Sequence, residues 1–297
     1  MSTPERNLQM RTRFLSKCTN DEVDAYLDRS DVLFVAAGVT ELHGGLPLDA
    51  ESVLSEAMAL QLADKTDSLV LHNLPYLYAG ATASGRGTTQ VSVRSSIDYL
   101  YALSESLIRQ GFRRIIWTSL HGPAGLFISP VIRDIFDTHK VPMLYIDALE
   151  ALLHGQAGDI LGGHSGDDPF GDLTVAAYDI LGRLNDVPLT TPDTEYWAQR
   201  RKPSIGFAQD LVATAFGSGS VAYYFNDLTD HMRTQALRTI DDRSAAAARG
   251  RLAFTALMDQ IPITKLIDDL KALDLYNQNA MDRHPSAAGP LAWPARS

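Results

Sequence analysis

The sequence predicts an α/β protein in which a mostly parallel central sheet is covered by helices on both faces. Short apolar runs of strand length alternate along the chain with longer runs in which apolar residues recur at helical spacing. Parallel strands need a long crossover between one strand and the next, usually a helix, and this alternation supplies one each time. The chain shows no internal repeat, and its 297 residues are enough to bury a sizeable core.

Four short segments have the composition of buried strands. The first, "DVLFVAAG" at 31–38, is almost entirely apolar and stops at Gly38, a residue that readily ends regular structure. The runs "SLVLHNL", "RRIIWTSL" and "VPMLYIDAL" are of similar length and character, and they occupy residues 68–74, 113–120 and 141–149. We therefore expect four strands, in this order along the chain.

Helices are predicted between and after these strands. In 51–65, apolar residues recur three or four positions apart, which places them on one face. The helix at 95–112 is expected to stop near Gly111, and the one at 125–140 can accept Pro130 if that residue lies in its first turns. The remaining helices are predicted at 172–184, with an Asp at the start, and at about 229–260.

The domain organisation is expected to be simple. Residues 1–280 carry the alternating pattern and are predicted to form a single α/β domain. Residues 281–297, "MDRHPSAAGPLAWPARS", are rich in Pro and Ala, which favours a tail or an arm onto a neighbouring subunit.

Composition and charge limit the partners. The net charge is −10 and no concentrated basic cluster is present, which argues against nucleic acid because phosphate binding needs a basic face. The single Cys18 excludes an intramolecular disulfide and any multi-cysteine metal site. Neither a signal-peptide pattern nor an apolar stretch of membrane length is seen. We expect a cytoplasmic protein that contacts no membrane.

Polar residues gather where the predicted strands end. Glu41 and His43 follow strand 31–38, and His121 follows strand 113–120. A third group comes after strand 141–149 in "GGHSGDDPFGD", with His164, Asp167, Asp168 and Asp172. Because ligands in open α/β sheets bind beyond the carboxyl ends of the strands, we expect these loops to form one pocket.

The spacing of Glu41 and His43 is compatible with metal binding. Side chains at i and i+2 in extended backbone point the same way, so both can reach one small volume. Oxygen ligands combined with imidazole suit Zn²⁺, Mn²⁺ or Fe²⁺. Taken alone, an acidic residue two positions from a histidine is a common pattern and indicates little. The hypothesis depends on the joint placement of these residues and His121.

At this point the sequence resembles a known family. "VLFVAAGVTELHGGLPLDAES" is similar to the signature of the creatininase (creatinine amidohydrolase) family, in which Gly-x-x-Glu-x-His-Gly leads to Leu-Pro-Leu and an acidic ligand. "GFRRIIWTSLHGPAG" and "GGHSGDDPFGDLTVAAYDIL" resemble two further motifs, and "LSKCTNDEVDAYLDRSD" fits the helix before the first strand. The resemblance spans about residues 14–260. It implies a three-layer α/β/α sandwich, a small-molecule substrate and a homo-oligomer, often a hexamer.

The resemblance also implies a ligand set. It makes Glu41, His43 and His121 metal ligands, and it places Glu51 where the family has an aspartate that bridges two metal ions. Asp49 is the competing choice for that position, and its alternative interpretation is an N-cap for helix 51–65. Asp172 matches a family glutamate and is assigned to metal binding and catalysis, although a first-turn acid can also simply favour the helix. The expected cofactor is one or two ions of Zn²⁺, Mn²⁺ or Fe²⁺.

Other residues complete the predicted site. His164 matches a histidine thought to transfer a proton, a role that suits an imidazole near neutral pH. The loop "YAGATASGRGTTQVS" at 78–92 corresponds to a substrate-side loop in the family, so Arg86 and Thr88, together with Gly122, are predicted to bind substrate. The alternative for this loop is a surface loop without a binding role.

Three departures from the family pattern bear on the substrate. The histidine usual before Leu-Pro-Leu is missing, "HGPAG" replaces His-Gly-Gly-Asn, and Pro123 stands where creatinine-hydrolysing members have a metal-binding glutamate. These changes leave the second ion open and argue against creatinine as the substrate.

The predicted activity is cleavage of a C–N bond in an amide, cyclic amide or formamide. A divalent ion lowers the pKa of bound water from about 15.7 to about 7, so that a metal-bound hydroxide can attack a polarised carbonyl. A second hypothesis keeps the metal but changes the bond, giving a C–C hydrolase, lyase or isomerase that acts on a cyclic ketone or sugar-like substrate. A third is a non-catalytic binding protein on the same scaffold.

Overall fold

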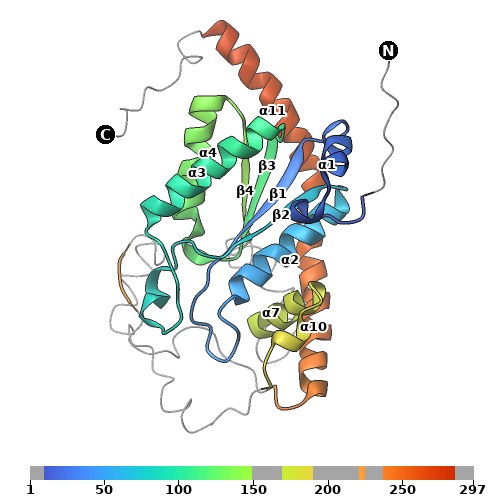
Figure 1. Ribbon diagram of the computed structural model, residues 1–297, viewed down its shortest axis with the longest axis vertical. Coiled ribbons are helices and arrows are strands. Elements are labelled where there is room, and N and C mark those ends of the chain that lie inside the picture. Colours follow the sequence, from blue (N-terminus) through green and yellow to red (C-terminus); the bar gives the residue numbers. More distant parts are fainter. Residues whose placement is uncertain (1–9, 149–168, 190–220, 225–236, 285–297) are drawn as a thin grey trace.

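The computed structural model describes residues 10–148, 169–189, 221–224 and 237–284 (Figure 1). At its centre lies a parallel sheet in the order β2-β1-β3-β4. The strands are β1 (Val32–Ala37), β2 (Leu69–Leu74), β3 (Arg114–Ser119) and β4 (Leu144–Asp147). The predicted fold class is confirmed, because each expected strand is present and these four strands pair in parallel. The central pair, β1 and β3, aligns Phe34 with Ile116.

The alternation of side chains along β1 explains the two covered faces. Successive residues of a strand point to opposite faces of the sheet. Phe34 and Ala36 belong to one buried apolar cluster, whereas Leu33, Val35 and Ala37 belong to another. Every residue of β1 is buried, which is why this strand has a continuous apolar sequence instead of an alternating one.

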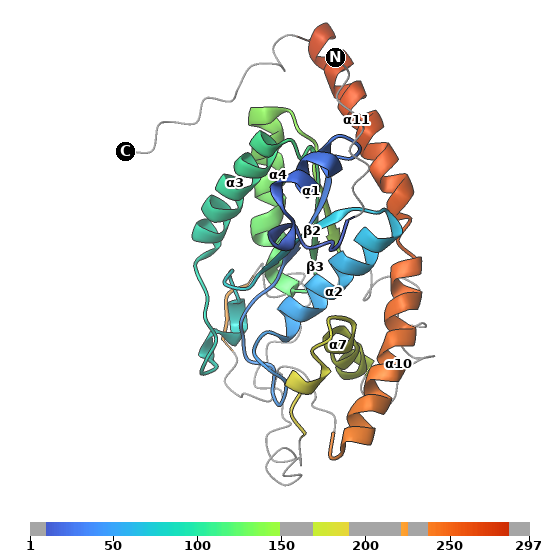
Figure 2. The same ribbon diagram turned by 45° about the vertical axis from the view of Figure 1, so that its right-hand side comes forward.

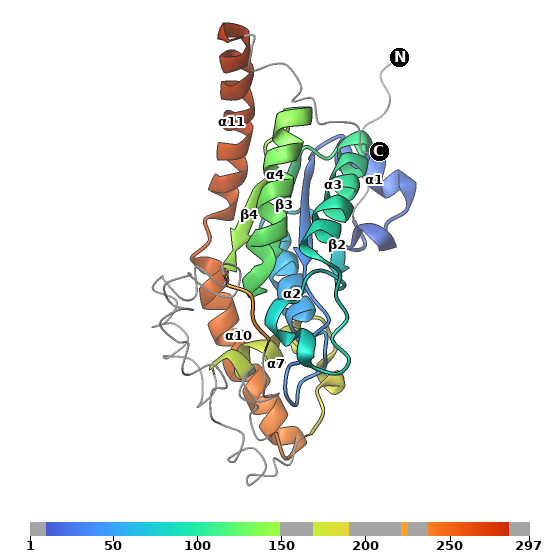
Figure 3. The ribbon, with the colours of Figure 1, turned by 90° about the vertical axis from the view of Figure 1, so that its left-hand side faces the viewer.

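Helices cover both faces of the sheet (Figure 2). One face packs against α1 (Asn20–Leu27), α3 (Val93–Gln110) and α4 (Gly125–His139). The other packs against α2 (Ala50–Lys65), α7 (Pro169–Ile180), α10 (Ile240–Asp259) and α11 (Ile263–Arg283). Short 3-10 turns are η1 (Leu15–Lys17), η2 (Gly80–Ser84), η3 (Gly122–Ala124) and η4 (Leu184–Asp186). The result is a three-layer α/β/α arrangement, and Figure 3 looks onto the layer of α3 and α4, which lies in front of the sheet.

Local sequence fixes several helix ends. The Ser92 hydroxyl accepts a hydrogen bond from the Ser95 N–H at the start of α3, and Gly111 ends that helix in a left-handed conformation with φ of 109°. Thr239 forms a capping box with Asp242, so α10 begins at Ile240. The helix predicted at 229–260 therefore starts later than expected among the described residues, and 229–236 lie outside them.

Helix α11 was not predicted. Its buried residues Ile263, Ile267 and Leu270 follow helical spacing and join the α2 side of the core. The helix continues to Arg283, so it includes the first three residues of the tail expected at 281–297. The remainder of that tail, residues 285–297, lies outside the described residues. Within the described ranges, no helix combines the length and the apolarity needed to cross a bilayer.

Candidate metal centre

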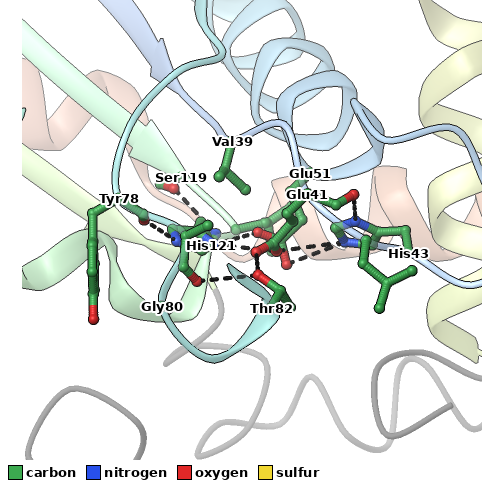
Figure 4. Close-up of polar contacts among 12 residues, drawn as sticks. Val39, Glu41, His43, Glu51, Tyr78, Gly80, Thr82, Ser119 and His121 are labelled. Atoms are coloured by element: carbon green, nitrogen blue, oxygen red, sulfur yellow. Dashed lines mark hydrogen bonds and ion pairs between the residues drawn. The ribbon is translucent and has the colours of Figure 1, made fainter. Parts of the chain in front are cut away.

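The loop after β1 and the end of β3 bring polar side chains together. Glu41 and His43 lie in the loop that leaves β1, and His121 follows β3, the neighbouring parallel strand. Glu51 comes from the first turn of α2, which begins shortly after that loop. Figure 4 shows these carboxylates and imidazoles turned toward one another. The convergence expected from the sequence is therefore present for these residues.

The distances are those of one compact cluster. His121 Nδ1 lies 2.5 Å from Glu51 Oε2 and 3.6 Å from Glu41 Oε1. His43 Nε2 lies 3.5 Å from Glu51 Oε1 and 3.9 Å from Glu41 Oε1. One ligand atom each from Glu41, His43 and Glu51 can be chosen so that all lie within 4.8 Å of one another. A single ion could thus contact atoms from each of these residues.

The cluster is buried, which raises the cost of every uncompensated charge. Glu41 is 1% exposed, His43 0%, His121 2% and Glu51 8%. Carboxylates removed from water in this way need hydrogen bonds, cations or metal ions to remain ionised. Two acids and two imidazoles in such a place form a set that protons or a metal ion must neutralise.

The electrostatics agree with this requirement. Burial by itself lowers the pKa of His121, but the Glu51 carboxylate, with help from Glu41, outweighs burial and raises it to about 9. Burial likewise opposes protonation of His43, yet Glu51 and Glu41 raise its pKa above the ordinary value. For Glu51, burial favours the neutral acid, whereas His121 and His43 hold its pKa well below its usual range. Without an ion, the acids are therefore compensated by protonated imidazole.

Both imidazoles have one ring nitrogen anchored to a backbone carbonyl. His121 Nε2 lies 2.8 Å from the Tyr78 carbonyl oxygen, and His43 Nδ1 lies 3.2 Å from the Glu41 carbonyl oxygen. Because a carbonyl only accepts, each of these nitrogens carries the hydrogen, and the other nitrogen of each ring faces the carboxylates. Metal-ligating histidines usually show this arrangement, in which the second N–H fixes the tautomer.

These donors fit a divalent transition-metal ion. Carboxylate oxygen combined with imidazole nitrogen suits Zn²⁺, Mn²⁺ or Fe²⁺. The geometry supplies oxygen donors from Glu41 and Glu51 and nitrogen donors from His43 and His121.

Asp49 and Glu51 have different partners in the structure. Asp49 occupies the N-cap position of α2, but its side chain makes no capping hydrogen bond. Instead, its carboxylate accepts hydrogen bonds from the Tyr178 hydroxyl at 2.5 Å and from Arg183 at 2.8 Å. Burial, followed by the contact with Asp49, raises the pKa of Tyr178 and keeps its hydroxyl protonated as a donor. Of the two candidate acids, Glu51 is the one next to the histidines.

Asp172 is placed differently from the expectation. It lies in the first turn of α7, fully buried, and its two oxygens accept hydrogen bonds from Arg249 of α10, each 2.8 Å long. At Gly250, a Cβ atom would come within 1.9 Å of the Asp172 carbonyl oxygen, so α7 and α10 approach as closely as glycine permits. The carboxylate of Asp172 therefore joins these two helices. Its predicted catalytic and metal-binding roles stay predictions.

The remaining predicted residues lie around the cluster or outside the description. His164 lies outside the described residues. Arg86 is exposed, and Gly122 is exposed at the start of η3, directly after His121. Thr88 is partly buried, and its hydroxyl accepts from the Leu42 N–H at 3.0 Å and donates to the Thr82 carbonyl at 2.9 Å. Thr88 therefore braces the loop, and substrate binding by Arg86, Thr88 and Gly122 stays a prediction.

Sequence reasoning missed one contact of the cluster. The Thr82 hydroxyl donates to the Glu41 carboxylate, and Thr82 is 3% exposed. The only signal for it was the density of Ser and Thr in residues 78–92, which does not single out one hydroxyl.

Fold and cluster together define an α/β protein with a candidate divalent-metal centre beyond the carboxyl ends of a parallel sheet. The model of the creatininase (creatinine amidohydrolase) family matches residues 16–171, which is more than half of the chain. The chain belongs to the creatininase family.

Solved structures share the fold at low identity. A crystal structure of creatinine amidohydrolase (creatininase) is 17% identical with a TM-score of 0.51, over 85% of this chain and 99% of that one. A provisional creatinine amidohydrolase from Bacteroides fragilis is 14% identical with a TM-score of 0.54, over 86% and 95%. A structure titled "Creatininase Mn" is 16% identical with a TM-score of 0.50, over 85% and 100%. A comparison with curated proteins found no match.

Proposed function

We propose that this protein is a metal-dependent hydrolase that cleaves a C–N bond of a small polar substrate, such as an amide, a cyclic amide or a formamide. The observation that carries the proposal is the buried cluster of Glu41, His43, Glu51 and His121, with distances of 2.5–3.9 Å between imidazole nitrogens and carboxylate oxygens. Family membership supports the same activity class.

The cofactor is one or two divalent ions, held first by these four side chains. When bound, such an ion supplies a Lewis acid and a water of lowered pKa. Zn²⁺, Mn²⁺ and Fe²⁺ all suit the donors, and a solved relative is titled as a Mn form. We assign Asp172 to a second ion, for which its carboxylate would exchange the ion pair with Arg249 for the metal.

The chain's own residues would orient the substrate and move a proton. Amide cleavage leaves a nitrogen that must be protonated, and we assign this step to His164, with a gain on the order of 10²–10⁴ in rate. Arg86 and Gly122 are assigned to the substrate side of the cluster because both are exposed, one in the 78–92 loop and one directly after His121. Because Pro123 replaces a family ligand, the proposed substrate is an amide other than creatinine.

A product assay tests the reaction. The purified chain is stripped with a chelator, reloaded with Mn²⁺ or Zn²⁺, and incubated with a panel of cyclic amides, formamides and short amides. Formation of a free amino group, on the opened product or as a released amine or ammonia, is the expected result, and it should require the ion and be abolished by Glu51→Gln. Glu105→Gln is a matched control, because Glu105 pairs with His139 on α3 and α4, away from the cluster. Metal-dependent turnover of a cyclic ketone or sugar without amine release would support the C–C hydrolase, lyase or isomerase instead.

Two further assignments follow the resemblance. We propose a homo-oligomer, a hexamer in the family's usual form, acting in the cytoplasm on a small molecule. Native mass spectrometry of the full chain tests the assembly, and a monomer at micromolar concentration would contradict it.

A further inference from the structure

Several hydrogen bonds join the loop Tyr78–Gln90 to the candidate metal centre. Consecutive residues of the Glu41 segment each bond it: Thr40 accepts from the Thr89 N–H at 2.9 Å, and the Leu42 N–H donates to Thr88 at 3.0 Å. Between them, the Glu41 carboxylate accepts from the Thr82 hydroxyl. The loop therefore forms hydrogen bonds with the backbone on both sides of Glu41 and with the Glu41 side chain.

The same loop also holds His121. The Tyr78 carbonyl accepts the Nε2–H of His121 at 2.8 Å, which leaves Nδ1 facing Glu41 and Glu51. Tyr78 and Thr82 thus orient one nitrogen ligand and one oxygen ligand of the candidate centre, which come from different strands (Figure 4).

Close packing keeps the loop in this position. A Cβ atom at Gly85 would come within 2.6 Å of the Leu42 side chain, and one at Gly87 within 2.6 Å of Leu48. Gln90 joins the two ends of the loop, because its side-chain oxygen accepts hydrogen bonds from the N–H groups of Ala79 and Gly80 at 2.9 and 3.2 Å. Thr82 is therefore presented to Glu41 by a fixed backbone.

We infer that Thr82 is a positioning residue of the metal centre: its buried hydroxyl fixes the Glu41 carboxylate in the orientation that binds the ion. The inference rests on the proposed metal site and adds a residue outside the ligand set. In a buried place, a carboxylate that loses this hydroxyl donor can rotate, and a rotated carboxylate binds a metal ion less tightly. Hydrogen-bond partners of metal ligands typically contribute about 10–100-fold in affinity.

The test compares three variants of the full chain. Thr82→Val removes the hydroxyl at nearly constant volume, and Thr82→Ser restores it. Thr89→Val is the matched control: the Thr89 hydroxyl donates to the Gly87 carbonyl within the same loop, and the hydrogen bond from the Thr89 N–H to Thr40 survives the change. The dissociation constant for Mn²⁺ or Zn²⁺ is measured by competition with a chromogenic chelator, and the melting temperature of the stripped chain is recorded beside it.

The expected result is a 10–100-fold weaker affinity in Thr82→Val, recovered to within about threefold in Thr82→Ser and unchanged in Thr89→Val. Wild-type affinity in Thr82→Val, or an equal loss in both valine variants, would overturn the inference while leaving the metal centre intact. If the wild-type chain itself bound neither ion, the proposed function would fail together with it. A stripped Thr82→Val chain that fails to fold is replaced in the comparison by Thr82→Ser against Thr82→Ala.

Discussion

The imidazole of His121 lies 2.5 Å from the carboxylate of Glu51, although seventy positions separate them in sequence. One side chain leaves the central strand β3 and the other opens helix α2 on one face of the sheet. Their contact exists only when the parallel sheet and its covering helix are assembled. The candidate metal centre is thus a product of the tertiary fold, and variants can test each part of it.

Removal of an imidazole should abolish tight metal binding. His43→Ala and His121→Ala each delete a nitrogen donor of the cluster, and we expect affinity for Mn²⁺ or Zn²⁺ to fall by more than the roughly 100-fold typical of a hydrogen-bond partner. Equilibrium dialysis followed by elemental analysis measures the bound ion. His139→Ala, which removes a partly exposed histidine paired with Glu105, should retain it. Full metal content in His43→Ala would rule out this ligand.

Substitutions of Glu51 and Asp49 should have different effects, the first on metal affinity and the second on stability. Glu51→Gln removes a charge from the cluster and should weaken metal binding while the fold persists. Asp49→Asn loosens the contacts with Tyr178 and Arg183, and we expect a loss of roughly 1 kcal/mol in stability with metal affinity retained. Chelator competition and urea unfolding of both variants give the two quantities. The reverse pattern would make Asp49 the ligand.

Arg249→Met should destabilise the fold, since it leaves the fully buried carboxylate of Asp172 without its bidentate partner. Breaking a buried pair costs about 3–5 kcal/mol, and the figure here should be nearer 1–3 kcal/mol because Arg249 is 42% exposed. Urea unfolding of the metal-free chain measures it. Arg133→Met removes a surface pair with Asp137 and should cost under about 1 kcal/mol. Equal costs would show that the Asp172 pair contributes no more than a surface pair.

Glu22 should make stability fall in acid. Its hydrogen bonds from the Arg11 side chain and the Thr19 N–H lower its pKa from the ordinary 4.5 to about 2. A depressed pKa in the folded state stabilises that state above pH 4.5, and this contribution is lost as the pH falls toward 2. Glu22→Gln should therefore be less stable than wild type at pH 7, with the difference shrinking toward pH 2.

Chemical unfolding at both pH values measures that difference. The control is Asp24→Asn on the exposed face of the same helix, for which only a small difference in stability is expected. A gap between wild type and Glu22→Gln that stays constant from pH 7 to pH 2 would contradict the prediction.

The strands and most helices could be predicted because burial on both faces leaves a clear pattern. Strand β1 is apolar at every position, and α2 carries its apolar residues at helical spacing. Helix α11 was missed although Ile263, Ile267 and Leu270 carry the same spacing, since charged and other polar residues lie between the apolar ones and lower its apolar signal. The start of α10 depended on a capping box at Thr239 that was not recognised.

The site was partly predictable for a similar reason. Glu41, His43 and His121 follow adjacent parallel strands, and strand order alone brings them to one edge. The choice between Asp49 and Glu51 could not be made, because two positions at a helix start face nearly opposite directions and spacing does not say which one faces the loop. The contact of Thr82 with Glu41 could not be predicted, because the two residues are 41 positions apart and any hydroxyl of the loop could have formed this hydrogen bond.

Tyr178 and Arg183, which donate hydrogen bonds to Asp49, lie beyond residue 171, where the family match ends. A fragment cut there would retain every clustered acid and imidazole, yet it would lack the partners that anchor the beginning of α2, from which Glu51 projects. The segment matched by the family model is therefore shorter than the packed structure that supports the cluster.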